Sequence, residues 1–348
     1  MTSGSKFKMA AVGDINLRDF SVGGDHFAQI MPYLKSMNCS IGNLEGLFAE
    51  PEELFYKPGF KHVGEGHAPT LANAGFKAVN MANNVTFGAS AIETTLKQLD
   101  EAGIAHTGAG LNRSQAKTPI KIHVDGYIIG VVGRTSIFWP HGHEAKDDQA
   151  GIMPLRVSTS YRPHRRHYEL PGAKPDVVTI PDEQELKELE TDLEELRSEV
   201  DILVAFFHFG VSSDREVAQY QRTVARASID AGADVVLGSQ AHVIQPIEVY
   251  KDCPIIYGMG QVIFGWDFIA KQLHPGQPGL IVELDIDADD NPHWSARFVV
   301  PDEKLLPRII PMDEVPGETE YLKKTSLDAI EFADDRIKVK ANGRRLQR

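Results

Sequence analysis

Short apolar runs alternate with amphipathic segments from the N-terminus to about Val300. Runs of this length are typical of strands that are buried on both faces, so the alternation predicts an α/β fold. The pattern predicts strands at residues 8–12, 78–81, 127–132, 202–207, 235–237, 255–257, 280–285 and 296–300, and helices at 27–35, 91–102, 182–200 and 217–231. We expect Thr179 to cap the helix at 182–200, with Pro181 in its first turn.

Two segments depart from this alternation. Residues 135–179 are rich in Pro, His, Arg and Gly, and they are long for a plain connection. Their aromatic residues Trp139, Tyr161 and Tyr168 favour an ordered loop, and we expect the segment from Trp139 to Tyr168 to cover a site as a lid. The pattern therefore predicts one domain over residues 1–310 with a lid or insert at about 135–180, and a charged tail at 311–348 to which we assign no chemistry.

Charge and cysteine content exclude several classes of protein. The net charge of -13 and the lack of a long basic cluster argue against nucleic-acid binding. The two cysteines, Cys39 and Cys253, form no Cys-x-x-Cys pair, which excludes a disulfide scaffold and fits a reducing compartment. No apolar run is long enough for a signal peptide or a membrane span, so we expect a cytoplasmic protein without a membrane anchor.

Polar side chains recur where predicted strands end, which is where ligands gather in open α/β sheets. Taken singly, each is more often a turn former, a helix cap or a core histidine than a ligand. Their recurrence favours a hydrolytic site, because mixed carboxylate, amide and imidazole donors hold Mn, Fe or Zn ions that activate water. The residues are Asp14, Asn43, Glu45, Asn83, Asn84, His208, Gln240 and His242.

The order of these motifs resembles the CapA-type bacterial capsule, or poly-γ-glutamate, synthesis protein family. The resemblance covers roughly residues 7 to 265 and rests on VGDIN, GNLEG, ANN, HFG, LDEAGIAHTGAG, DAGADVVLGSQAHVIQPIEVY and IIYGMGQVIF. It implies a fold of the calcineurin-like metallophosphoesterase type, with a central β-sandwich flanked by helices. It also implies one or two divalent metal ions held by Asp14, Glu45, Asn84, His208, Gln240 and His242.

The chain departs from the family pattern at four positions. Val85 replaces the histidine that assists the leaving group in phosphatase relatives, and Gly88 stands where an Asp is expected. Gln240 replaces a histidine, and Gln261 replaces an asparagine. A neutral amide oxygen is a poorer ligand than imidazole for these metals. The site is therefore expected to hold one metal, to bind metal weakly, or to bind none.

The segment RTSIFWPHGHEA supplies further candidates directly after a predicted strand. His141 and His143 would supply the acid, the base or the extra ligand that the standard positions lack, or would lie in an exposed loop. Arg134 would pair with a substrate carboxylate or phosphate, or form an ordinary salt bridge. Together with His208 and His242, these three residues are the catalytic candidates.

Three functions fit these observations. The first is a metal-dependent hydrolase, or a related enzyme, that acts on an acyl, amide or phosphate-containing small molecule. The second takes the resemblance literally and predicts a soluble γ-glutamyl hydrolase or cyclase. The third is a non-catalytic binding module that retains the fold without metal, as the losses at Val85, Gly88 and Gln240 would allow. The expected partner is a small-molecule or γ-glutamyl substrate, with neither nucleic acid nor membrane involved.

Overall fold

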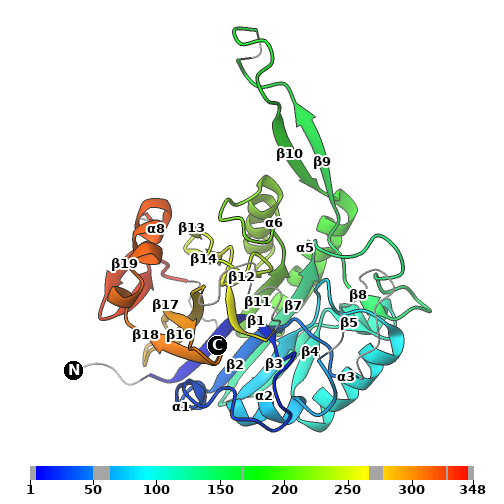
Figure 1. Cartoon of the computed structure of the whole chain (residues 1–348), viewed down its shortest axis with the longest axis vertical. Helices are drawn as coiled ribbons and strands as arrows, with labels where there is room; N and C mark the ends of the chain where they lie inside the picture. Colours follow the sequence, from blue (N-terminus) through cyan, green and yellow to red (C-terminus); the bar gives the residue numbers. More distant parts are fainter. Residues whose placement is uncertain (1–4, 50–62, 167, 266–276, 327, 344–348) are drawn as a thin grey trace.

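The computed structural model describes residues 5–49, 63–166, 168–265, 277–326 and 328–343, and it contains two β-sheets that face each other (Figure 1). The larger sheet has the order β19-β20-β17-β16-β1-β2-β3-β4, with β15 beside β1 and β18 beside β17. Its strands are β1 (Phe7–Asn16), β2 (Cys39–Leu44), β3 (Phe76–Asn80), β4 (Ala105–Thr107), β15 (Gln261–Phe264), β16 (Gly279–Ile286), β17 (Pro292–Pro301), β18 (Pro307–Ile310), β19 (Ile330–Ala333) and β20 (Arg336–Val339).

The smaller sheet has the order β13-β14-β12-β11-β7-β6 and lies against the larger one across the main core. Inward side chains such as Met9 on β1 and Phe206 in the smaller sheet meet in this core, with both fully buried. The strands of the smaller sheet are β6 (Ile120–Val124), β7 (Tyr127–Thr135), β11 (Ile202–His208), β12 (Val235–Ser239), β13 (Ile247–Tyr250) and β14 (Cys253–Ile256).

Helices cover the outer face of each sheet, which confirms the predicted sandwich flanked by helices. On the larger sheet, Ala10 and Val12 point away from the core and pack beneath the helices there. Because β1 is buried on both faces, its sequence is a continuous apolar run. The larger sheet is covered by α1 (Met31–Leu34), α2 (Ala68–Ala74) and α3 (Ala89–Glu101), and the smaller by α5 (Glu183–Arg197) and α6 (Gln219–Asp230).

The eight predicted strands correspond to β1, β3, β7, β11, β12, β14, β16 and β17, and three of the four predicted helices to α3, α5 and α6. The helix predicted at 27–35 is regular only over Met31–Leu34, although the spaced apolar residues Phe27, Ile30 and Leu34 are buried as expected. The predicted cap of the helix at 182–200, Thr179, was wrong. Asp182 is the cap and accepts hydrogen bonds from the backbone N–H groups of Gln184 and Glu185.

Residues 135–179 contain secondary structure that the sequence pattern did not predict. Within this segment, β8 (Gly151–Ile152) pairs with β5 (Ala109–Gly110). The short helix α4 (Arg113–Lys117) lies beside both strands. Further along, β9 (Val157–Arg162) and β10 (Asp176–Pro181) form an antiparallel hairpin that projects from the body at the top of Figure 1. The predicted lid from Trp139 to Tyr168 was wrong for this half of the segment, because Tyr161 and Tyr168 are 71% and 89% exposed. This half of the segment does not cover a strand-end site.

The chain after Pro311 continues the fold. It forms η1 (Met312–Glu314), α8 (Pro316–Ser326) and the β19-β20 hairpin, and β20 pairs with β17 in the larger sheet. Leu322 of α8 and Ile337 of β20 are fully buried in the main core. Among the described residues, no helix is both long and apolar enough to cross a membrane.

A buried ion pair joins the smaller sheet to α5. Arg134 on β7 is 1% exposed, and its guanidinium donates hydrogen bonds to Asp192 on α5 and to the Gly133 carbonyl. Lys117 also contacts Asp192, at 2.8 Å. Of the two alternatives for Arg134, the structure agrees with the salt bridge and not with the substrate anion, because Asp192 on α5 already occupies its guanidinium.

Removing either partner of this pair should have unequal effects on stability. Asp192→Ala leaves the Arg134 guanidinium buried without its counter-charge, so we expect a loss of about 3–5 kcal/mol of unfolding free energy. Arg134→Met should cost less than half as much, because Asp192 keeps Lys117 and methionine refills the space. Urea unfolding of the two variants beside the parent measures the difference. Equal losses would contradict the inferred burial penalty.

Candidate metal site

Polar side chains gather where the C-terminal ends of β1 and β2 meet those of β11 and β12. At this point β1 approaches the loop before β15 closely: a Cβ atom on Gly13 would lie 1.9 Å from the Gly260 carbonyl oxygen. The Asp14 N–H donates to that same carbonyl at 3.1 Å. Glycine at position 13 is therefore required for the approach, and it places the next side chain, Asp14, between the two sheets.

The Asp14 carboxylate is fully buried and surrounded by hydrogen-bond donors. Its Oδ1 accepts from Asn43 Nδ2 at 2.7 Å, and its Oδ2 accepts from the Gln240 N–H at 3.1 Å. His242 Nδ1 lies 3.2 Å from Oδ2, and His208 Nδ1 lies 3.7 Å from Oδ1. Burial acts to raise the pKa of Asp14, but the positive charge of the neighbouring His242 outweighs it and holds that pKa well below its usual range. Asp14 is therefore a carboxylate at neutral pH.

His208, the last residue of β11, is held by hydrogen bonds on both ring nitrogens. Nδ1 lies 3.2 Å from Asn43 Nδ2, which can only donate, so Nδ1 accepts. Nε2 then carries the proton and donates to Asn84 Oδ1 at 2.9 Å. Burial lowers the pKa of His208, so the ring is neutral, as a metal ligand must be. Asp14 Oδ1 lies 3.7 Å from the same Nδ1.

His242 lies between two carboxylates. Its Nδ1 is 3.2 Å from Asp14 and its Nε2 is 3.8 Å from Glu45 Oε1, while Phe264 packs edge-on against the ring at 5.0 Å. Burial acts to lower the pKa of His242, but Glu45 and Asp14 together raise it to about 9. Without a metal, an imidazolium therefore balances one of the two negative charges.

The backbone after β12 turns through an unusual conformation to deliver these groups. Gln240 and His242 have φ values of 87° and 54°, in the left-handed region that non-glycine residues seldom adopt. Such strain persists where the surrounding structure imposes it, and it is concentrated at functional sites. Here the turn directs the Gln240 N–H at Asp14 and inserts the His242 ring beside it.

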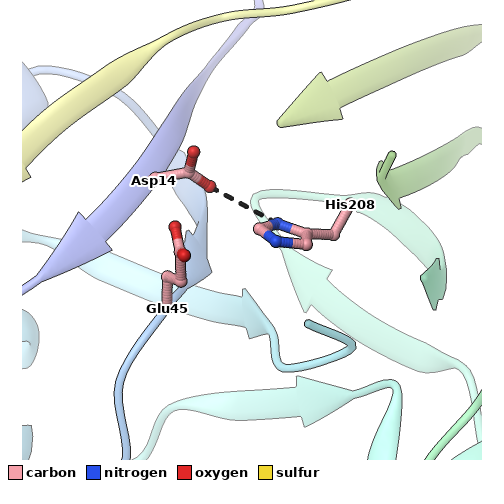
Figure 2. A group of neighbouring side chains, drawn as sticks. All are labelled: Asp14, Glu45 and His208. Atoms are coloured by element: carbon pink, nitrogen blue, oxygen red, sulfur yellow. Dashed lines mark ion pairs between the residues drawn. The ribbon is translucent and has the colours of Figure 1, made fainter. Parts of the chain in front are cut away.

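The side chains fit a divalent cation. Asp14, Glu45 and His208 each offer a ligand atom, and these atoms lie within 4.8 Å of one another. Figure 2 shows the three side chains converging from β1, from the segment after β2 and from the end of β11. Carboxylate oxygen with imidazole nitrogen suits Mn, Fe or Zn. Within the described residues, Gln240 Oε1 and Gln261 Oε1 are also buried without a hydrogen-bond partner, and Gln261 is the Cα neighbour of Asp14 in the β1-β15 pairing.

The other predicted site residues lie elsewhere or have structural roles. His143 is buried; its Nδ1 accepts from the Trp139 N–H and its Nε2 donates to the Thr86 carbonyl, both at 2.9 Å. Burial lowers the pKa of His143 to about 4, so it is a neutral residue that anchors the loop and does not act as acid, base or ligand. His141 is exposed on this loop, which agrees with the exposed-loop alternative. Arg134 faces α5, as described above.

Two departures from the family pattern have local explanations. Val85 is buried, and its N–H donates to the Asn83 side chain, which also binds the Leu44 carbonyl. Asn83 therefore shapes the turn that presents Asn84. Gly88 has a φ of 94° and precedes the first residue of α3, so glycine there serves the backbone conformation.

The sequence pattern missed Asn80, which lies behind the site and binds Asn43. Asn43 donates to Asp14 and His208, and its own Oδ1 accepts from Asn80 Nδ2 at 2.9 Å. Asn80 Oδ1 in turn accepts from the Ala82 N–H at 3.1 Å. This chain fixes the amide orientation of Asn43, which orients both ligands. A signal for this pair was present in the sequence, because Asn43 and Asn80 each lie at the end of an apolar run, in β2 and β3.

The charge on His242 predicts a pH dependence of stability in metal-free protein. A folded-state pKa of about 9, above the ordinary value of 6.5, contributes stability that is complete below pH about 6.5 and is lost as the pH rises to about 9. The full shift corresponds to at most about 3 kcal/mol. Urea unfolding with a chelator at several pH values should show this decline in the parent and a flatter curve in His242→Gln. An equal decline in both proteins would contradict the assignment.

Comparison with known proteins gives several relatives. The capsule biosynthesis protein CapA of Bacillus anthracis is 28% identical over 276 residues, which is 75% of this chain and 61% of that protein. The PGA biosynthesis protein CapA of Bacillus subtilis (strain 168) is 28% identical over 249 residues, 69% of this chain and 57% of that protein. A probable polyglutamine synthesis accessory protein of Mycobacterium tuberculosis is 26% identical over 66% of this chain and 56% of that protein.

The chain thus spans 61% and 57% of the lengths of the two CapA proteins. A crystal structure of a hypothetical protein from Thermus thermophilus covers 87% of this chain and 96% of its own, with a TM-score of 0.43 and 13% identity, which is too weak to bear on function. The model of the bacterial capsule synthesis protein family PGA_cap matches residues 8–266. This match includes every residue of the candidate metal site and confirms the resemblance to the CapA type. The chain belongs to the bacterial capsule synthesis protein family PGA_cap.

Proposed function

We propose that the protein is a metal-dependent hydrolase that acts on an acyl, amide or phosphate-containing small molecule. The observation that carries this proposal is the buried convergence of Asp14, Glu45 and His208, with Asn84 and His242 in contact with them. Buried carboxylates without a metal are costly, and sites that tolerate such a cost are commonly functional.

Within this proposal, Asp14, Glu45, His208 and His242 hold the metal, with Asn84 and Gln240 beside them. A bound divalent ion would polarise the scissile group and lower the pKa of a bound water. Two carboxylates balance a charge of +2, so His242 gives up its proton when the ion binds. Asn84 keeps the proton of His208 on Nε2, so Nδ1 would bind the ion by exchanging its hydrogen bond from Asn43 for the metal.

The segment after β7 would contact the part of the substrate that does not react. Trp139 Nε1 donates to the Asn84 carbonyl at 3.0 Å, which links this segment to the site. A hollow of about 380 Å³ lies on the same segment, lined in part by Ser136, Phe138, Trp139 and Arg156. This volume is in the range of small-molecule pockets. Because the names of the relatives refer to capsule, PGA and polyglutamine synthesis, a γ-glutamyl amide is the first amide to test.

The second candidate is a binding module that has kept the fold without catalysis. The buried Val85 favours it, because a valine at this position cannot protonate a leaving group. The replacement of a histidine ligand by Gln240 also favours it, since the site then has one imidazole fewer. Metal content separates the two candidates, because only the hydrolase requires a bound ion.

Metal stoichiometry tests the proposal directly. We expect Asp14→Ala, His208→Ala and His242→Ala to lose most of the metal bound by the parent, while Arg134→Met, which lies outside the site, retains it. If Asp14 were only a turn residue, its loss would cost about 1 kcal/mol and leave the metal unchanged. Elemental analysis after supplementation with Mn, Fe or Zn gives the result, with melting temperatures as the control for folding. A parent without metal after supplementation would support the binding module instead.

Leaving-group dependence tests the role of position 85. A well-placed general acid is worth about a hundred- to ten-thousand-fold in rate, and Val85 supplies none. We therefore expect slow cleavage of alkyl phosphates, even with added Mn, and a much smaller deficit for p-nitrophenyl phosphate, whose leaving group needs little protonation. Steady-state rates on both esters measure the ratio. Fast alkyl phosphate cleavage would show that another residue acts as the acid.

A further inference from the structure

The β9-β10 hairpin, which we call the arm (residues 157–166 and 168–181), has little of its own structure to stabilise it. Figure 1 shows it standing clear of the rest of the molecule. In the part of the arm that the structure describes, the contacts with the body lie at its base: the Tyr220 N–H of α6 donates to Thr179 Oγ1 at 3.1 Å, and Pro181 is buried. Because a two-stranded hairpin is at best marginally stable in water, a partner would stabilise the arm.

The arm concentrates exposed apolar surface. Eight large apolar side chains are exposed among the described residues, and five of them lie between positions 161 and 180. Tyr161 and Val177 are directly opposite in the strand pairing, and they are 71% and 60% exposed. Opposite residues share one face of a hairpin. Thr179, two positions after Val177 on β10, lies on the same face and contacts α6 nearer the base of the arm. The exposed pair therefore extends a face that already packs against protein.

The arm and the body differ in charge. Residues 157–181 contain four cationic and two anionic side chains, a net charge of +2, so the rest of the chain, whose total is -13, carries -15. Within the arm, Arg162 pairs with Asp176 at 3.5 Å, and Arg166 pairs with Glu169 at 2.9 Å. Among the described residues, Arg165 and Lys174 have no ion-pair partner. Two of the four cationic side chains are thus already neutralised within the arm. The two that remain suit the few carboxylates of a protein surface better than a highly charged polymer.

We propose that the arm binds a second copy of this chain and forms a twofold-symmetric dimer. The acidic body supplies the complementary charge, and a twofold axis uses both arms, so the contact area of one arm is doubled. Stable interfaces need about 1,000 Å² or more, which favours an arrangement in which both arms contribute. Tyr161 and Val177 form the apolar centre of each contact, and Arg165 and Lys174 its charged rim.

The exposed side of α5 is the surface that fits this rim. The helix follows the arm directly in the chain, so a twofold axis near the arm base brings each arm to the partner's α5. Glu183 and Glu194 are exposed on the same side of α5, about three turns apart. Between them, Lys187 is already paired with Glu190 at 3.0 Å. Glu183 and Glu194 therefore remain to meet Arg165 and Lys174 of the other copy.

Sedimentation equilibrium of the full chain tests the dimer. We expect the parent to dimerise and Tyr161→Ser with Val177→Ser to be a folded monomer with an unchanged circular dichroism spectrum, because both side chains are exposed. Arg165→Glu with Lys174→Glu, and separately Glu183→Lys with Glu194→Lys, should each raise the dimer Kd at least about tenfold at low salt.

Mixing the two charge-reversed proteins provides the decisive control. In a mixed dimer, the acidic arm of one copy meets the basic α5 of the other, and the remaining arm and helix are both unaltered, so affinity should return to near the parent value. A mixture that stays monomeric overturns the α5 contact. A parent that is monomeric at about 100 µM overturns the proposal. Loss of poly-γ-glutamate binding on arm substitution, in a monomeric parent, would identify the arm as an anion-binding surface instead.

Discussion

The burial of the Asp14 carboxylate is the constraint on which the site depends. A charge removed from water costs several kcal/mol unless donors and counter-charges surround it, and here they come from both sheets. Asn43 from β2 in the larger sheet and the turn after β12 in the smaller sheet both bind this one carboxylate. The relative placement of the sheets at this edge is therefore tied to Asp14, and the strained φ of Gln240 is a local consequence.

The sandwich was predictable because its strands are buried on both faces. Met9 faces the opposite sheet and Ala10 faces the helices, so β1 is apolar throughout and is visible in the sequence. The arm lacked such a signal: β9 reads VSTSYR, and its side chains contact little of the body that would require apolar residues. The cap of α5 is Asp182 and not Thr179 because the helix begins at Glu183, while Thr179 lies within β10 and its hydroxyl oxygen accepts from the Tyr220 N–H.

The strand-end pattern predicted where the site lies but not which nearby groups serve it. Asp14, Glu45, Asn84, His208 and His242 are brought together because parallel strands deliver their C-terminal residues to one edge. His143 follows a strand in the same way, yet the Thr86 carbonyl and the Trp139 N–H occupy its nitrogens. These hydrogen bonds depend on the tertiary structure, and the spacing of residues along the sequence does not predict them. Asn80 was missed for the same reason, since its role depends on Asn43 in the neighbouring strand.

In the proposed metal site, the glutamines at positions 240 and 261 would affect both metal preference and stability. Their side-chain oxygens are buried without hydrogen-bond partners in the part of the chain that the structure describes, and an unsatisfied buried polar atom costs about 1–3 kcal/mol. Within the proposed metal site, a cation that accepts these oxygens removes this cost. Amide oxygen is a harder donor than imidazole nitrogen. A site with Gln240 in place of the histidine of the family pattern would therefore favour Mn over Zn. A ligand that binds only the folded state stabilises it, so under the proposed function the same two oxygens that would weaken zinc binding would also couple folding to the metal that they accept.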